Sequence, residues 1–346
     1  MARAVARRSL LAGLGTLAAP PAVAATPLRL LVLADIQAAP GALVAMRMAA
    51  EEFGGGRIGR TVDIVSADPG GDGVRAAGMV ERWIAEDDVA AVVVLEDGPG
   101  ALAAQAVCRA RQRIVLFCGP SGLALSGPGC DGGSFMWTGD DRAIGRAIAA
   151  HLAVSGQRSC RVMAGGAEAQ AAAVRTALAE QGIGEDMAGV AVLCGVGPLP
   201  PGPPGIAARL NQAALADAVG WLTVAPFAWS SVPSAGEAAL AWVRRFLQRA
   251  GRLPEIGDIG AYEAVRHVLG VVAASGGGAA GLARQMRYTP VNSPFTRGAQ
   301  IGRDGRVQRP MRLLRVLPPA ERRAGWDVFA ELRAVAPEAA GSVCPA

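Results

Sequence analysis

Few side chains in this 346-residue sequence have the types and spacing that chemistry at a site requires. Its two histidines, His151 and His267, lie far apart and have no cysteine or carboxylate at the spacing of a metal site. Ser121 stands in a Gly-Pro-Ser-Gly run, which lacks the Gly-X-Ser-X-Gly spacing of a strained nucleophile turn. We therefore expect no enzyme activity, no metal and no cofactor.

Other polar and small residues could instead bind a solute, because they follow apolar runs. Asp97 and Gly98 come between the run 90–95 and a helical segment, while Gly119 and Ser121 follow the next run. In a doubly wound parallel sheet such positions gather at one edge, where backbone N–H groups and hydroxyls meet ligands. Asp97 could equally serve only as a helix cap.

Three aromatic residues, Trp137, Phe227 and Trp229, could form the apolar walls of a small-molecule pocket. The alternative for each is ordinary core packing, because a single aromatic side chain is often buried for stability. The sequence leaves both interpretations open.

The elements that would position these residues alternate in type. Short apolar runs predict buried strands and the longer amphipathic segments between them predict helices, a pattern typical of an α/β fold with parallel sheets. In the first half we predict strands over 28–33, 61–67, 90–95 and 113–118, and helices over 41–53, 72–86 and 99–112.

A second, shorter series follows, with a Pro-Gly linker over 198–205 and a hairpin around Arg303-Asp304-Gly305-Arg306. Between Gly195 and Trp221 there is room for only one helix. We predict strands over 160–164, 189–194 and 221–225, and helices over 140–154, 167–181, 206–218, 236–249, 260–274 and 279–286.

The first 25 residues have the organisation of an export signal. Arginines precede an apolar run, and Ala22-Val23-Ala24 offers a cleavage site. Arg7-Arg8 resembles a twin-arginine signal, although an ordinary secretory signal fits as well. We expect a periplasmic protein without stable membrane insertion. Because removal of this segment lowers the formal charge from +5 to +2, we expect no nucleic-acid partner.

Six cysteines in an exported chain suggest disulfide bonds. Cys130 and Cys344 lie in loop-like surroundings and form the preferred pair. For the remaining cysteines, free buried thiols are the expected state.

Several stretches together carry a family resemblance. The chain resembles the type I periplasmic binding proteins of the branched-chain amino acid (Leu/Ile/Val-binding) family of ABC transporters, as a divergent member. The matching stretches are Ala49 to Gly55, Thr61 to Asp68, Ala101 to Arg109, Leu125 to Cys130, Gly298 to Gly305, Gly325-Trp326-Asp327 and Cys344-Pro345.

This resemblance implies two Rossmann-like lobes of doubly wound parallel sheet that are joined by a hinge and close on a ligand. The expected division is a signal over 1–25, a first lobe over 26–140 and 240–286, and a second lobe over 141–239 and 287–346. The second lobe is shortened, which predicts a narrower sheet.

The resemblance also implies departures at the ligand site. Leu123 and Gly165-Gly166-Ala167 stand where the family usually has polar or acidic anchors. Arg142 stands at the expected cleft edge and could pair with a carboxylate, or lie exposed on its helix.

These expectations predict a protein that captures a small amino-acid-like or more apolar ligand for an inner-membrane ABC permease. The alternative is a binding-deficient accessory or sensor protein that uses the same fold as an interaction scaffold.

Overall fold

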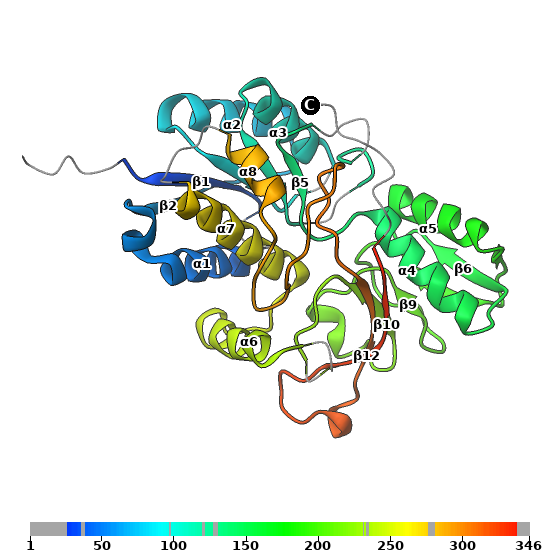
Figure 1. Cartoon of the computed structure of the whole chain (residues 1–346). Helices are drawn as coiled ribbons and strands as arrows, with labels where there is room; N and C mark the ends of the chain where they lie inside the picture. Colours follow the sequence, from blue (N-terminus) through cyan, green and yellow to red (C-terminus); the bar gives the residue numbers. More distant parts are fainter. Residues whose placement is uncertain are drawn as a thin grey trace, which may run out of the picture.

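Two sheets, each flanked by helices, divide the computed structural model of the chain into two lobes (Figure 1). The structure describes residues 26–35, 39–96, 98–119, 122–126, 131–230, 232, 235–275 and 281–337. Within these residues the first sheet has five strands in the order β2-β1-β3-β4-β5, and the second has seven in the order β12-β11-β10-β9-β8-β6-β7. The predicted α/β class with two lobes of largely parallel strands is confirmed.

The strands of the first sheet are short segments that are mostly apolar and buried on both faces, except for the half-buried edge strand β2. Leu30 and Val32 of β1 contribute to one core cluster, whereas Leu31 and Leu33 contribute to another. This alternation arises because successive residues of a strand point to opposite faces. All pairs are parallel, between β1 (Leu28–Leu33), β2 (Val62–Ala67), β3 (Ala91–Val94), β4 (Ile114–Phe117) and β5 (Ser134–Met136).

Two helices cover each face of this sheet. On one face α1 (Pro40–Ile58) packs against α7 (Ile256–Ala274), and on the other α2 (Gly73–Asp87) packs against α3 (Gly98–Ala110). Proline suits the first turn of α1, whose Pro40 has no N–H to leave unpaired, and Gly59 ends the helix in the left-handed conformation. The carboxyl ends of β1, β3 and β4 are thereby left as an open edge.

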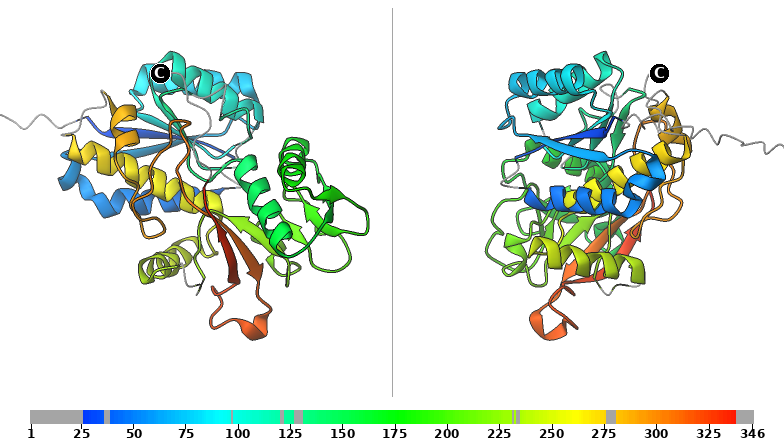
Figure 2. Two further views of the ribbon diagram at one scale, coloured as in Figure 1. Left: turned by 45° about the vertical axis from the view of Figure 1, so that its right-hand side comes forward. Right: turned by 90° about the vertical axis from the view of Figure 1, so that its left-hand side faces the viewer.

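The second sheet combines a parallel part with an antiparallel hairpin. Helices α4 (Asp141–Val154) and α5 (Glu168–Glu180) pack together against one face of this sheet and are drawn in green in Figure 2. The parallel strands are β6 (Ser159–Met163), β7 (Gly184–Glu185), β8 (Val190–Leu193), β9 (Ile206–Ala207) and β10 (Leu222–Ala225); the hairpin is β11 (Met311–Val316) and β12 (Phe329–Val335), joined through the short turn η3 (Pro319–Glu321).

The connection between β8 and β10 in the second lobe contains the short strand β9 but no α-helix. Over 206–218 the predicted helix is wrong, because β9 and the short turn η2 (Ala213–Leu215) occupy it. The expected narrowing of the sheet is also wrong, since β9 fills the place between β8 and β10. On one face of this sheet, Ala225 and Val316 belong to the same core cluster as Trp242 and Phe246 of α6 (Glu237–Ala250).

The chain passes from one lobe to the other three times, as the assignment of the strands to the two sheets shows. It crosses between β5 and α4, returns between β10 and α7, and crosses again before β11. Before the last crossing, α8 (Leu282–Tyr288) leads to residues beside β5, where the N–H groups of Met136 and Val307 donate to Gly305 and Met136 at 2.9 and 3.1 Å. The predicted turn at 303–306 is present there, and the strands of the second sheet resume at Met311.

A buried ion pair holds the third crossing against the first lobe. Arg309 donates to Glu263 of α7 at 2.6 Å and to the hydroxyl of Thr296 at 3.0 Å. Its guanidinium also lies 4.6 Å from the ring centre of Phe227. The Glu263 side chain is completely buried and that of Arg309 is 6% exposed, so removing either charge leaves the other without compensation.

We expect Arg309→Leu to lower the free energy of unfolding by about 3–5 kcal/mol, because it leaves the Glu263 carboxylate buried and unpaired. Urea unfolding of the purified protein measures the change. The control is Arg175→Leu, which removes an exposed ion pair with Glu185 and should cost less than about 1 kcal/mol. Equal losses in the two variants would contradict the structural role of Arg309.

A second buried group predicts how stability depends on pH. His267 of α7 is 5% exposed, and its Nε2 lies 3.1 Å from the carbonyl oxygen of Met286. That nitrogen carries the proton, because a carbonyl oxygen only accepts. Burial lowers the pKa of His267 below its ordinary value of 6.5.

The unfolded chain therefore binds a proton at this site at higher pH than the folded chain does. The stability that neutral His267 contributes is complete above pH 6.5 and is lost as the pH falls toward the lowered pKa. We expect His267→Gln, whose amide can still donate to Met286, to lose less stability between pH 7.5 and 5 than the parent protein. Unfolding curves at both pH values test this, and parallel losses would refute it.

Candidate ligand-binding cleft

Two neighbouring cavities lie where the open edges of the two sheets face each other. The larger, of about 540 Å³, has walls from Gly98, Leu102 and residues 122–125 of the first lobe and from Asp141, 166–170, Gly195, Val196 and Arg209 of the second. The smaller, of about 160 Å³, lies against Leu95, Gly119 and the starts of α1 and α7. Val196 and Arg209 border both cavities, which therefore form one cleft between the lobes.

Exposed apolar side chains gather in this cleft. Leu102 and Leu123 of the first lobe are 41% and 43% exposed, and Val196 of the second lobe is 61% exposed. Apolar side chains that remain open to solvent inside a cavity between two lobes are typical of a surface that covers a ligand. The cleft therefore favours a solute with a hydrocarbon portion.

The polar part of the cleft is a hydrogen-bonded chain on the second lobe. Arg209, which follows β9, donates to Oδ1 of Asp141 at 3.1 Å. Gln170 of α5 donates to the same oxygen at 2.7 Å, and its own carbonyl accepts from the Gly195 N–H at 2.7 Å. Asp141 and Gln170 are both 4% exposed, so this chain connects the starts of α4 and α5 to the ends of β8 and β9.

The corresponding edge of the first lobe is acidic. Asp35, Asp68 and Glu96 follow β1, β2 and β3. Burial raises the pKa of Glu96, and the nearby carboxylates of Asp68 and Asp35 raise it further. These three residues border neither cavity, whereas Glu255 and Asp258 border the smaller one. Burial raises the pKa of Asp258 to about 6, although Arg252 pairs with it at 2.8 Å. An anionic group of a solute is therefore disfavoured beside Glu255 and Asp258.

The structure brings two of the predicted binding residues to the cleft. Gly98 lies at the start of α3 on the larger cavity, and Gly119 follows β4 on the smaller one. Arg142 is exposed on α4 and does not border either of these two cavities. Asp97, Ser121, Cys130 and Cys344 lie outside the described residues.

The three predicted aromatic residues lie in the core instead. Trp137 is fully buried beside His267 with ring centres 5.5 Å apart, and Phe227 packs edge-on against Phe295. Trp229 is 6% exposed and packs edge-on against Phe329. These positions correspond to the core-packing alternative, and the walls of the cleft are aliphatic.

The cleft residues that the sequence did not single out are Arg209, Asp141 and Gln170. Arg209 fell inside the segment predicted as a helix, where an arginine has no distinguishing feature. The available signal was Ile206-Ala207-Ala208, a short apolar run that follows a Pro-Gly linker and ends at Arg209. Read as a buried strand, this run would have placed Arg209 at the ligand edge.

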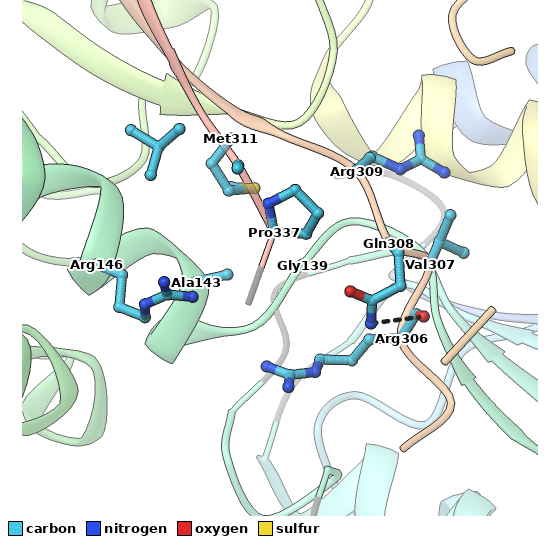
Figure 3. Close-up of a pocket in the computed structure, with 11 residues that line it drawn as sticks. Gly139, Ala143, Arg146, Arg306, Val307, Gln308, Arg309, Met311 and Pro337 are labelled. Carbon is cyan, nitrogen blue, oxygen red and sulfur yellow. Dashed lines mark hydrogen bonds between the residues drawn. The ribbon is translucent and has the colours of Figure 1, made fainter. Parts of the chain in front are cut away.

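Two further cavities lie away from the cleft, and one of them, of about 440 Å³, is bordered by residues of α8 and its flanks: Gly281, Arg284, Gln285, Tyr288 and Thr289. A cavity of about 40 Å³ near the hinge, between Gly139, Arg146 and Arg306, has room only for water (Figure 3). Arg309 borders it but points away toward α7. Among the described residues no group of three His, Cys, Asp or Glu side chains could hold a metal ion.

The four described cysteines are buried and unbonded, as expected for free core thiols. They are Cys108, Cys118, Cys160 and Cys194. Burial raises the pKa of each thiol, to about 11 for Cys160, so they remain protonated and unreactive at neutral pH.

In the described part of the chain, no helix combines the length and apolar character needed to cross a bilayer.

Comparisons with known proteins agree with this geometry. A family model described as periplasmic binding protein matches residues 34–192 and 161–321. A search of curated proteins found no match. A branched-chain amino acid ABC transporter periplasmic ligand-binding protein from Burkholderia xenovorans has a similar structure, with a TM-score of 0.77, 19% identity, and coverage of 90% of this chain and 96% of that one.

Two further solved structures are similar over most of their length. One is an ABC transporter solute-binding protein from R. palustris in complex with benzoate, with a TM-score of 0.74, 14% identity, and coverage of 92% and 99%. The other is a leucine-, isoleucine-, valine-, threonine- and alanine-binding protein from Brucella ovis, with a TM-score of 0.71, 17% identity, and coverage of 90% and 95%. At these identities the similarity concerns the fold.

The tight packing at Gly119 gives a testable consequence. Its N–H donates to Val94 at 3.3 Å and its carbonyl accepts from the Thr138 hydroxyl at 2.8 Å, while a Cβ at this position would lie 2.1 Å from the carbonyl oxygen of Leu95. We expect Gly119→Ala to destabilise the fold by about 1–3 kcal/mol through overpacking.

Thermal and urea unfolding would measure this effect. The control is Gly78→Ala on α2, where a Cβ meets nothing within 4 Å and the better helix propensity should stabilise by about 0.5–1 kcal/mol. An unchanged stability of Gly119→Ala would show that β3 and β4 can separate at this edge.

Proposed function

Because this chain belongs to the periplasmic binding protein family, we propose that it captures a small amino-acid-like or more apolar organic solute for an inner-membrane ABC permease. The observation that carries the proposal is the cleft of about 540 Å³ between the open edges of the two sheets, with apolar walls and one polar chain. A cavity of this size suits a solute of a few to a dozen non-hydrogen atoms. Binding by enclosure requires no bond chemistry.

The walls of the cleft favour the more apolar end of this range. Leu102, Leu123 and Val196 present aliphatic surface from both lobes. Solved structures with the same fold include proteins named for branched-chain amino acids and one in complex with benzoate. Both kinds of solute combine a hydrocarbon portion with a carboxylate, which matches the mixture of groups in this cleft.

Capture would proceed by approach of the two lobes. Gly98 and Gly119 offer backbone groups on the first lobe, and the second lobe contributes Arg209 and the start of α5. We propose a first lobe of 26–140 with 240–286, and a second lobe of 141–239 with 287–346, which includes the final hairpin. An export signal in residues 1–25 would deliver the protein to the periplasm, where an inner-membrane permease can receive the solute.

We expect the protein without residues 1–25 to be stabilised by solutes in a thermal-shift screen of amino acids, amides, short carboxylates, and apolar alcohols and aromatics. A solute at 100 times its Kd should add about 2.7 kcal/mol to the free energy of unfolding, which corresponds to a shift of about 4 °C for a chain of this size. Isothermal titration of each hit gives the affinity and stoichiometry.

The same screen separates the proposal from its alternative. A cooperatively folded protein that no solute stabilises would favour a binding-deficient accessory or sensor protein that uses the fold as an interaction scaffold. The observation behind that alternative is the chain between β8 and β10, which contains no α-helix.

A further inference from the structure

We propose that Arg209 is the specificity-determining residue of the cleft, and that it selects organic monocarboxylates with a hydrocarbon body by receiving their carboxylate. This inference rests on the proposed function and adds the chemical class of the solute. It assigns the charged end of the solute to the second lobe and the hydrocarbon end to the first.

The position of Arg209 in the cleft supports this role. It is the one cationic side chain among the described residues that border the two cavities, and it borders both of them. The sequence contains no lysine, so an arginine is the available cation for such a role. Its side chain is 13% exposed, so an ion pair formed there would be only weakly screened by water.

The hydrogen-bonding capacity of Arg209 also supports this role. A guanidinium carries five N–H donors in a planar fork that matches a carboxylate. The contact with Asp141 is a single bond from one terminal nitrogen. Gln170 occupies the same Asp141 oxygen and is itself held by Gly195, so Asp141 is fixed by other groups and acts as a positioning residue for Arg209.

The start of α5 supports the same placement. Residues 166–170 border the larger cavity together with Arg209. No side chain caps this 13-residue helix at Ala167, and the first N–H groups of a helix have no partner within it. The positive end of the helix dipole points to the same part of the cleft, where the exposed carboxylate of Glu168 in the first turn partly offsets it.

The first lobe is less suited to a carboxylate. Glu255 and Asp258 border the smaller cavity on this lobe, and like charges so close disfavour another negative group. Leu102 and Leu123 on this lobe have no polar group to offer. A monocarboxylate therefore fits with its charge toward Arg209 and its hydrocarbon portion toward these leucines.

The test compares solutes that differ only in charge. Benzoate is paired with benzamide, and 4-methylpentanoate with 4-methylpentanamide, with benzyl alcohol as a neutral reference. We expect the protein to bind each acid at least 10-fold more tightly than its amide at pH 7.5, because only the acid forms charge-assisted hydrogen bonds. Isothermal titration and thermal shift measure both members of each pair.

Arg209→Met keeps much of the length and removes the charge, and we expect it to weaken binding of the acids roughly 10- to 100-fold while the amides change little. Because this variant leaves Asp141 without its cation, the double variant Arg209→Met with Asp141→Asn removes both charges of the pair and should fold and show the same loss. Arg175→Met, on the exposed side of α5, is the control and should retain the preference for acids.

The outcomes distinguish this inference from the proposed function. Equal affinity for acids and amides, or a preference for acids that survives in both Arg209 variants, overturns the role of Arg209 while solute capture stands. A panel in which no acid, amide, alcohol or amino acid binds the folded parent protein overturns both. A preference for acids that disappears with Arg209 and persists in Arg175→Met supports the inference.

Discussion

The carboxyl ends of the parallel strands in both lobes face a single cleft, and this constraint determines which residues can meet a solute. Neighbouring parallel strands need a crossover connection, which is usually a helix. The carboxyl ends of these strands therefore all lie at the same edge of the sheet. In the first lobe this places Leu95 and Gly119, which follow β3 and β4, at the cleft. In the second lobe it places Val196 and Arg209 opposite them, after β8 and β9. Residues from distant parts of the chain thus come together without any local sequence motif.

Most of the framework could be predicted because apolar runs report burial directly. The first four strands coincide with their predicted runs to within a residue, since a strand buried on both faces is a continuous apolar segment. The glycines at 54–56 were harder to interpret, because glycine usually ends a helix, yet α1 continues through them to Ile58. The packing of α1 against α7 outweighs the local preference there.

The site could be predicted only in part, for a different physical reason. Gly98 and Gly119 follow recognisable strands, so their place at the edge could be inferred. Arg209 follows β9, a strand of two residues that is too short to produce a periodic pattern. Trp137 and Phe227 are in the core because of their neighbours His267 and Phe295, which come from distant segments that no local pattern connects to them.

The core that joins α6 to both sheets has a mechanical consequence. Ala225 and Val316 of the second sheet belong to the same apolar cluster as Trp242 and as Leu30 of the first sheet. A hinge rotation of the lobes must leave this close-packed cluster intact, so the side of the molecule around α6 acts as a fixed wall. A cleft that closes against a fixed wall selects solutes by their length as well as by their charge.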